Sequence, residues 1–357
     1  MSKRYAMLQA LLAAALFGLS APLSQVLLSD IEPILLAAFL YLGSGLSAWL
    51  LLLATGAWRG RRGEAQGEAG IRRADWPWLA GALVVGGVAA PIVLMFSLQA
   101  TPASTASLLL NFEGIATTLI AAWVFGEQVG RRVWLAVALV SLSGVLLSWA
   151  DAGNEWGVSL GALGVLGACF LWGVDNNLTR QISAKNPLSI VAIKGIGAGA
   201  CSLLLGVVAG NALPSLRSIV YAMLVGGLCY GVSIVLFILA LRGLGAARTS
   251  ALFGAAPFIG ALLSLVIFGE TPDLFFVAAF LLMVVGAFFL LGEAHAHRHR
   301  HLRAFHEHRH RHDDAHHEHA HAPGGTPARG YHSHWHRHEP FEHAHQHAPD
   351  IHHRHAH

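Results

Sequence analysis

Runs of apolar residues, separated by short polar connections, make up the first 293 residues of the chain. A helix needs about 20 mostly apolar residues to cross about 30 Å of hydrocarbon. Ten runs of suitable length lie at 5–28, 34–55, 77–98, 102–125, 132–150, 157–179, 188–209, 218–241, 245–268 and 273–292. The pattern predicts an all-α integral membrane protein with ten transmembrane helices and the lipid bilayer as its main environment.

The composition agrees with this prediction. Hydrophobic residues make up 55% of the chain and charged residues only 12%, whereas soluble proteins carry about 25% charged residues. Cys169, Cys201 and Cys229 lie inside apolar runs without metal-ligand spacing, which is typical of packing residues. The sequence contains no nucleophile–base constellation and no nucleotide-binding motif, so we expect no enzyme activity, no required cofactor and no nucleic-acid partner.

Basic residues collect in alternate connections between the runs. If the N-terminus lies inside, the outside loops contain only Arg217. The inside segments then hold thirteen basic residues: Lys3, Arg4, Arg59, Arg61, Arg62, Arg72, Arg73, Arg131, Arg132, Arg180, Lys185, Arg242 and Arg248. Lys and Arg favour the cytoplasmic side, so both termini are predicted to be cytoplasmic, in a bacterial inner membrane. A cleaved signal peptide is the alternative for the first run, but nine similar runs follow it.

The sequence contains an internal repeat. Residues 98–150 resemble residues 241–293 at an offset of 143, and both copies contain Phe-Gly-Glu, at 125–127 and at 268–270. A weaker match, at an offset of 155, aligns the aromatic-Gly pairs at 17–18 and 172–173. Five runs per copy is an odd number, so the second copy must insert upside down. We therefore predict two inverted five-helix repeats, 1–150 and 151–293, followed by a tail from 294 to 357.

The aromatic-Gly pairs, the Phe-Gly-Glu tripeptides and the apolar stretch around Pro257 together resemble the drug/metabolite transporter superfamily, of the EamA type. This resemblance covers about 290 residues and excludes the tail. It implies a helical bundle around a central cavity and alternating-access transport of a small organic solute. One departure stands out, because Glu113-Gly114 in the first half corresponds to Ala256-Pro257 in the second.

Ionisable residues inside a membrane are costly and therefore mark candidate functional sites. Glu113 lies in the fourth run, Asp175 in the sixth and Lys194 in the seventh. At 1.5 Å per residue, Asp175 lies roughly 6 Å and Lys194 roughly 9 Å from the inner ends of their helices. The two helices are consecutive and antiparallel, so we expect an ion pair with either a structural or a substrate-binding role.

Glu113 has no obvious partner in the sequence. It could bind a proton or a cationic part of a substrate, or it could be a protonated side chain that hydrogen-bonds to a neighbouring helix. Thr117 lies one turn later on the same helix face. Asn111 and Asn176 are further candidates for substrate binding or coupling because amide side chains are unusual on lipid-facing helices.

The tail differs in composition from the rest of the chain. All 23 histidines of the protein follow residue 294, many as His-x-His. Few apolar residues accompany them, so the tail is predicted to be disordered. Imidazole binds zinc, copper and nickel, and a Ni, Co, Zn or Cu site is predicted in the first part of the tail at His295, His297, His299, His301, His306, His308, His310 and His312.

Three functions remain open from the sequence alone. The first is a small-metabolite transporter. The second is a transition-metal transporter that collects Ni, Co or Zn through its tail, although the first 293 residues contain no histidine. The third is a metal- or pH-responsive membrane sensor. Deletion of the tail distinguishes them, while the substrate, the direction of transport, the coupling ion and the oligomeric state do not follow from the sequence.

Overall fold

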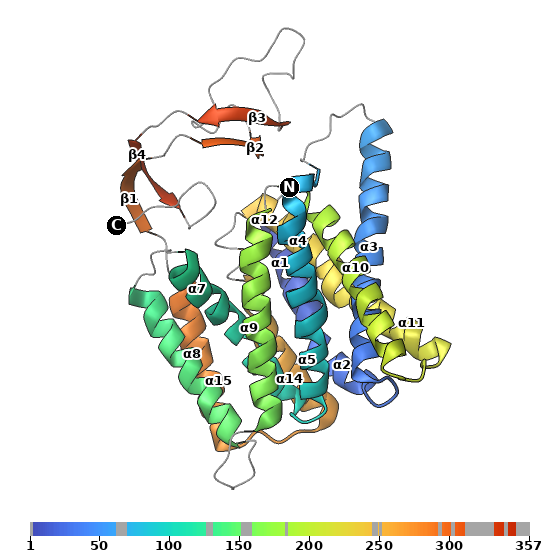
Figure 1. Ribbon diagram of the computed structural model, residues 1–357. Helices are drawn as coiled ribbons and strands as arrows, with labels where there is room; N and C mark the ends of the chain where they lie inside the picture. The colour runs from blue at the N-terminus through green and yellow to red at the C-terminus, as the bar shows by residue number, and fades with distance from the viewer. Residues whose placement is uncertain are drawn as a thin grey trace.

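The computed structural model describes residues 3–61, 70–125, 131–150, 159–182, 185–244, 249, 252–291, 295–300, 304–310, 332–338 and 342–347. In these ranges, every secondary-structure element up to residue 291 is a helix. This confirms the helical prediction for this part of the chain. The helices stand side by side in one bundle, and the strands of the tail lie beside one end of it (Figure 1). The boundary predicted between residues 150 and 151 falls at the edge of the described residues. Residue 294, the predicted start of the tail, falls outside them.

The helices follow the predicted apolar runs, and several runs are built from two or three shorter helices in series. In the first half these are α1 (Lys3–Gly18), α2 (Ser20–Leu27), α3 (Pro33–Arg61), η1 (Arg73–Asp75), α4 (Trp76–Ala82), η2 (Leu83–Ala89), α5 (Ala90–Leu98), α6 (Ala103–Leu109), α7 (Phe112–Phe125) and α8 (Arg131–Ala150). In the second half they are α9 (Leu160–Arg180), α10 (Pro187–Val208), α11 (Leu216–Val225), η3 (Gly226–Val232), α12 (Ser233–Leu244), α14 (Ala256–Phe268) and α15 (Leu274–Leu291).

Two of these segments, η2 and η3, are π-helices of seven residues. Each contains adjacent glycines and interrupts the middle of a longer helix, η2 between α4 and α5 and η3 between α11 and α12. The first begins at Leu83 and the second at Gly226, so they are 143 residues apart. This is the offset of the internal repeat, so the two halves share an irregular feature that apolar composition alone would not produce. Short π segments occur frequently at functional sites.

The packing of the helices relates the two halves. Helix α3 packs along α10, and α8 packs along α15; the members of each pair occupy equivalent positions in the two halves. Helix α1 packs against α12, and α9 packs against α5, so the first helix of each half contacts the third run of the other (Figure 1). Each half therefore completes its core with helices from the other half of the chain.

The aromatic-Gly pairs permit two further close approaches between the halves. A Cβ atom on Gly18 would lie 3.1 Å from the backbone nitrogen of Gly260 on α14, and one on Gly173 would lie 2.9 Å from the backbone nitrogen of Thr117 on α7. Gly260 and Thr117 are themselves 143 residues apart. Each pair thus packs the first helix of one half against the fourth run of the other.

Substitution of Gly173 by Ala should destabilise the protein by about 1–3 kcal/mol because an added methyl group would overpack the α7–α9 contact. Gly167→Ala on the same helix is the matched control, since a Cβ atom there meets nothing within 4 Å. The measurement is the thermal unfolding midpoint of each variant in detergent. Equal midpoints for the two variants would show that the α7–α9 contact accommodates the methyl group without loss of stability.

Large apolar side chains cover the outside of the bundle, as expected for a surface in contact with lipid; Leu50, Trp123, Val208 and Val266 are examples. Six helices in the described ranges are long and apolar enough to cross a membrane, and three further apolar helices are shorter. Helix α9 is not among them because Asp175, Asn176 and Asn177 lower its mean hydropathy. The count of ten spans stays a prediction.

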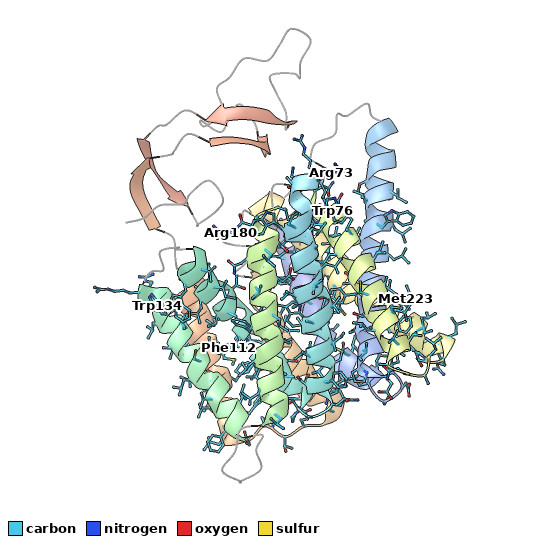
Figure 2. All side chains as sticks on the ribbon, viewed as in Figure 1. Arg73, Trp76, Phe112, Trp134, Arg180 and Met223 are labelled. Carbon is cyan, nitrogen blue, oxygen red and sulfur yellow. The ribbon has the colours of Figure 1, made fainter. Side chains whose placement is uncertain are left out.

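Basic residues mark one end of the bundle. Arg73 and Arg180 lie near the same end, close to Trp76, although more than a hundred residues separate the two arginines (Figure 2). Lys185 forms an ion pair with Asp75 at 3.5 Å and joins the connections before α4 and after α9. Trp76 is half exposed, as in the aromatic belts of membrane interfaces. This arrangement agrees with the predicted orientation, which stays a prediction.

The second Phe-Gly-Glu tripeptide ends α14. Gly269 has φ 64°, the left-handed conformation that commonly ends a helix and favours glycine. The hydroxyl of Ser104, in the first turn of α6, donates a hydrogen bond to the carboxylate of Glu270. The tripeptide therefore combines a helix stop with a contact to the other half. Gly126 and Glu127 of the first copy lie outside the described residues.

The tail differs from the expected disorder over four short stretches. The structure describes strands β1 (His295–Arg300), β2 (Ala304–His310), β3 (His332–His338) and β4 (Glu342–His347). Strand β1 pairs with β4 and β2 with β3, both antiparallel. The His-x-His alternation has the two-residue period of a strand, which the prediction of disorder from composition overlooked.

Candidate binding cavity

A cavity of about 820 Å³ lies inside the helical bundle. Its lining residues come from both halves of the chain, including α2, α7 and α9, the end of η3, and the start of α14. One side, which we call the polar wall, consists of Asn111, Glu113, Asp175 and Asn176. The cavity therefore collects four of the five substrate-site residues predicted from the sequence. The fifth, Lys194, is attached to it through Asp175.

Glu113 lies in the first turn of α7, where the helix restarts after the break at Leu110–Asn111. The side-chain amide of Asn176 on α9 donates a hydrogen bond of 2.8 Å to Oε1 of Glu113 and another of 3.1 Å to Oγ1 of Thr117. Thr117 in turn donates to the backbone carbonyl of Glu113 at 2.8 Å. The same-face prediction for Glu113 and Thr117 is confirmed, and these bonds orient the Glu113 carboxyl group at the cavity surface.

Asp175 and Lys194 form the predicted ion pair, between Oδ2 and the ammonium group. Thr179 donates a hydrogen bond of 3.0 Å to the other carboxylate oxygen of Asp175. The Asp175 side chain is only 4% exposed and that of Lys194 is 18% exposed. Gly86 of η2 makes room for the carboxylate, which a Cβ atom at that position would overlap. Asp175 is thus neutralised by a partner from the protein.

The carbonyl oxygen of Gly86 orients two aromatic side chains. The Tyr41 hydroxyl donates to it at 2.8 Å and the Trp172 indole nitrogen at 3.0 Å. In the π register this carbonyl would bond to the N–H of residue 91, as Val85 does to Ala90. Residue 91 is a proline and has no N–H. The Gly86 carbonyl therefore lacks this partner within its own helix and is available to Tyr41 and Trp172.

Aromatic rings from several runs form a second part of the cavity lining, which we call the aromatic wall. Phe17 and Phe253 have ring centroids 5.3 Å apart, and Phe237 and Phe253 are 4.8 Å apart. Phe17 also meets Tyr230 edge to face at 5.8 Å, and Tyr230 lies 6.2 Å from Tyr41. The distances fall within the range of favourable aromatic pairs, so Tyr41, Tyr230, Phe17, Phe253 and Phe237 form a continuous surface.

Sequence reasoning did not identify this aromatic wall. Apolar rings that line a cavity and rings that face lipid occur in the same apolar runs, so composition does not separate them. Asn177, in contrast, does not line the cavity: its amide donates to the carbonyls of Thr117 and Gly173 and holds α9 against α7. The side chains of the eight tail histidines predicted to bind metal lie outside the described part, and no group of metal-binding side chains occurs among the residues described.

An apolar helical bundle with an internal, partly polar cavity is the architecture of a multi-pass membrane protein. A sequence profile of the EamA-like transporter family matches residues 4–149 and again residues 159–292. The chain therefore belongs to the EamA-like transporter family, as its sequence features indicated.

Two known proteins are similar to this chain, one in sequence and one in fold. An uncharacterized transporter of Methanothermobacter thermautotrophicus is 28% identical over 290 residues, covering 78% of this chain and 83% of its own. A protein of known crystal structure shares the fold with a TM-score of 0.57 at 19% identity, covering 80% of this chain and 95% of its own.

Proposed function

We propose that the protein is a secondary transporter that moves a small organic metabolite across a bacterial inner membrane by alternating access, with both termini in the cytoplasm. The observation that carries the proposal is the cavity of about 820 Å³, large enough for a metabolite and lined by polar and aromatic side chains from both halves. Substrate sites of transporters with inverted repeats lie between the halves.

Four features support the inverted repeat, because in each of them a segment or contact of one half has an equivalent in the other half. These are the two separate family matches, the two π segments 143 residues apart, the reciprocal packing of the first helices, and the equivalent close approaches at Gly18 and Gly173. Exchange of the two halves maps each contact onto another. Such a pair of halves can rock about a central site so that it opens to each side in turn.

Transport of a transition metal receives less support from the cavity. Its lining contains carboxylates and amides but no histidine or cysteine among the described residues, whereas soft and imidazole ligands suit Zn, Ni and Cu. Metal binding by the tail, and a sensing role for it, stay predictions that do not depend on the cavity.

Alternating access can be tested without knowledge of the substrate. Gly114 lines the cavity and a Cβ atom there meets nothing within 4 Å, so Gly114→Cys should fold normally. In a chain whose three native cysteines are replaced, we expect a membrane-impermeant maleimide to label Cys at position 114 in both right-side-out and inverted vesicles. Gly167→Cys is the matched control, because it also has space but does not line the cavity.

The control should remain unlabelled from both sides, since a charged reagent does not enter lipid. Labelling of the Gly114→Cys protein from one side only would contradict alternating access. Labelling of both variants alike would show that the reagent does not report on the cavity.

A further inference from the structure

The charges that line the cavity do not balance. Glu113 and Asp175 are its acidic lining residues, and the described lining contains no basic side chain. Asp175 has its counter-charge in Lys194. The side-chain hydrogen bond that Glu113 receives comes from Asn176, a neutral amide. Within the described residues the cavity therefore presents one carboxyl group without a cationic partner from the protein.

The remainder of the cavity surface is suited to an apolar or aromatic group. The aromatic wall supplies five rings, and Ile234, Pro257 and Val284 add further apolar surface. The faces of aromatic rings also attract cations within about 6 Å. An anion would meet an acidic group and electron-rich ring faces, while a small hydrophilic solute would leave the aromatic wall unpaired.

The internal repeat shows that the single carboxyl group is a feature of one half. Position 113 corresponds to Ala256 at the offset of 143, and position 175 corresponds to Ser20 at the offset of 155. Both Ala256 and Ser20 line the same cavity. Each acidic lining residue therefore has an uncharged counterpart in the other half, and a matching ligand carries one positive charge together with an apolar body.

On the basis of the proposed function, we infer that the transported molecule is an organic monocation with an aromatic or extended apolar body. Its charged group lies at the Glu113 carboxylate, within reach of the Asn176 amide, and its body packs against the aromatic wall. Asp175 remains paired with Lys194 and lines the cavity beside it. This assignment names the chemical class of the substrate and makes Glu113 the residue that determines specificity for charge.

Four indole compounds that differ in charge provide the test: tryptamine, a cation; tryptophol, neutral; indole-3-acetate, an anion; and tryptophan, a zwitterion. Binding of each to the purified full-length protein in lipid nanodiscs is measured by calorimetric titration at neutral pH. Hydrogen bonds to charged groups contribute about 1.5–3 kcal/mol, so tryptamine should bind at least about tenfold more tightly than tryptophol. Ethylamine, which has the ammonium group without the ring, should bind at least about tenfold more weakly than tryptamine.

The outcomes separate this inference from the proposed function. Equal or tighter binding of tryptophol or indole-3-acetate overturns the cationic class and leaves a transporter of another solute. Binding of none of the indoles overturns the aromatic-cation assignment. In each case the cysteine-labelling experiment decides alternating access on its own, because it involves no ligand.

Discussion

Replacement of Glu113 by Gln should reduce tryptamine counterflow into proteoliposomes by at least about tenfold, while the protein still inserts and unfolds at an unchanged temperature. Gln retains the size of the side chain and an oxygen that can accept the 2.8 Å hydrogen bond from Asn176, but it cannot carry a negative charge. The loss of a hydrogen bond to a charged group accounts for the expected magnitude.

Glu32→Gln is the matched control for this variant. Glu32 is exposed in the connection before α3 and does not line the cavity, so the same chemical change should leave counterflow unaltered. Normal counterflow by Glu113→Gln would remove Glu113 from the substrate site and favour the reading of a hydrogen-bonded structural carboxyl group. Reduced counterflow in both variants would point to a general effect of charge.

Asp175→Asn should destabilise the protein by about 3–5 kcal/mol because it leaves the Lys194 ammonium group without its partner inside the bundle. The double variant Asp175→Asn/Lys194→Met should recover most of this loss, since an apolar side chain removes the unpaired charge. The measurement is the free energy of unfolding of the two single variants and the double variant in detergent, arranged as a double-mutant cycle.

A double variant as unstable as Asp175→Asn alone would show that the cost comes from another contact, such as the hydrogen bond from Thr179. Tryptamine binding by the double variant then separates the two roles considered for the pair. Retained binding would assign it a structural role, and lost binding would place it in the substrate site.

The sequence predicted the Asp175–Lys194 pair because it depends on local geometry. The two residues lie on consecutive antiparallel helices, so the rise per residue was enough to place them at similar depth. The partner of Glu113 was beyond this reasoning, because Asn176 comes from a helix of the other half. Which helices meet across the two halves depends on packing details such as the space at Gly173.

The aromatic wall and the π segments were not predicted, for different physical reasons. Phe17 and Phe237 look the same in the sequence as rings that face lipid. The π segments have the same apolar composition as the α-helices around them, and only the adjacent glycines and Pro91 hinted at an irregular turn. The strands of the tail follow an alternation that the composition-based prediction of disorder disregarded.

The free carbonyl of Gly86 has a consequence for the energetics of ligand binding. Because Pro91 never competes for this oxygen, Tyr41 and Trp172 are tethered to the backbone before any ligand arrives. Rings that already occupy their bound orientation lose little rotamer entropy on association. Pro91 thus helps to hold Tyr41 and Trp172 rigid before a ligand binds. Less of the favourable free energy of their contacts with the ligand is then offset by lost side-chain entropy.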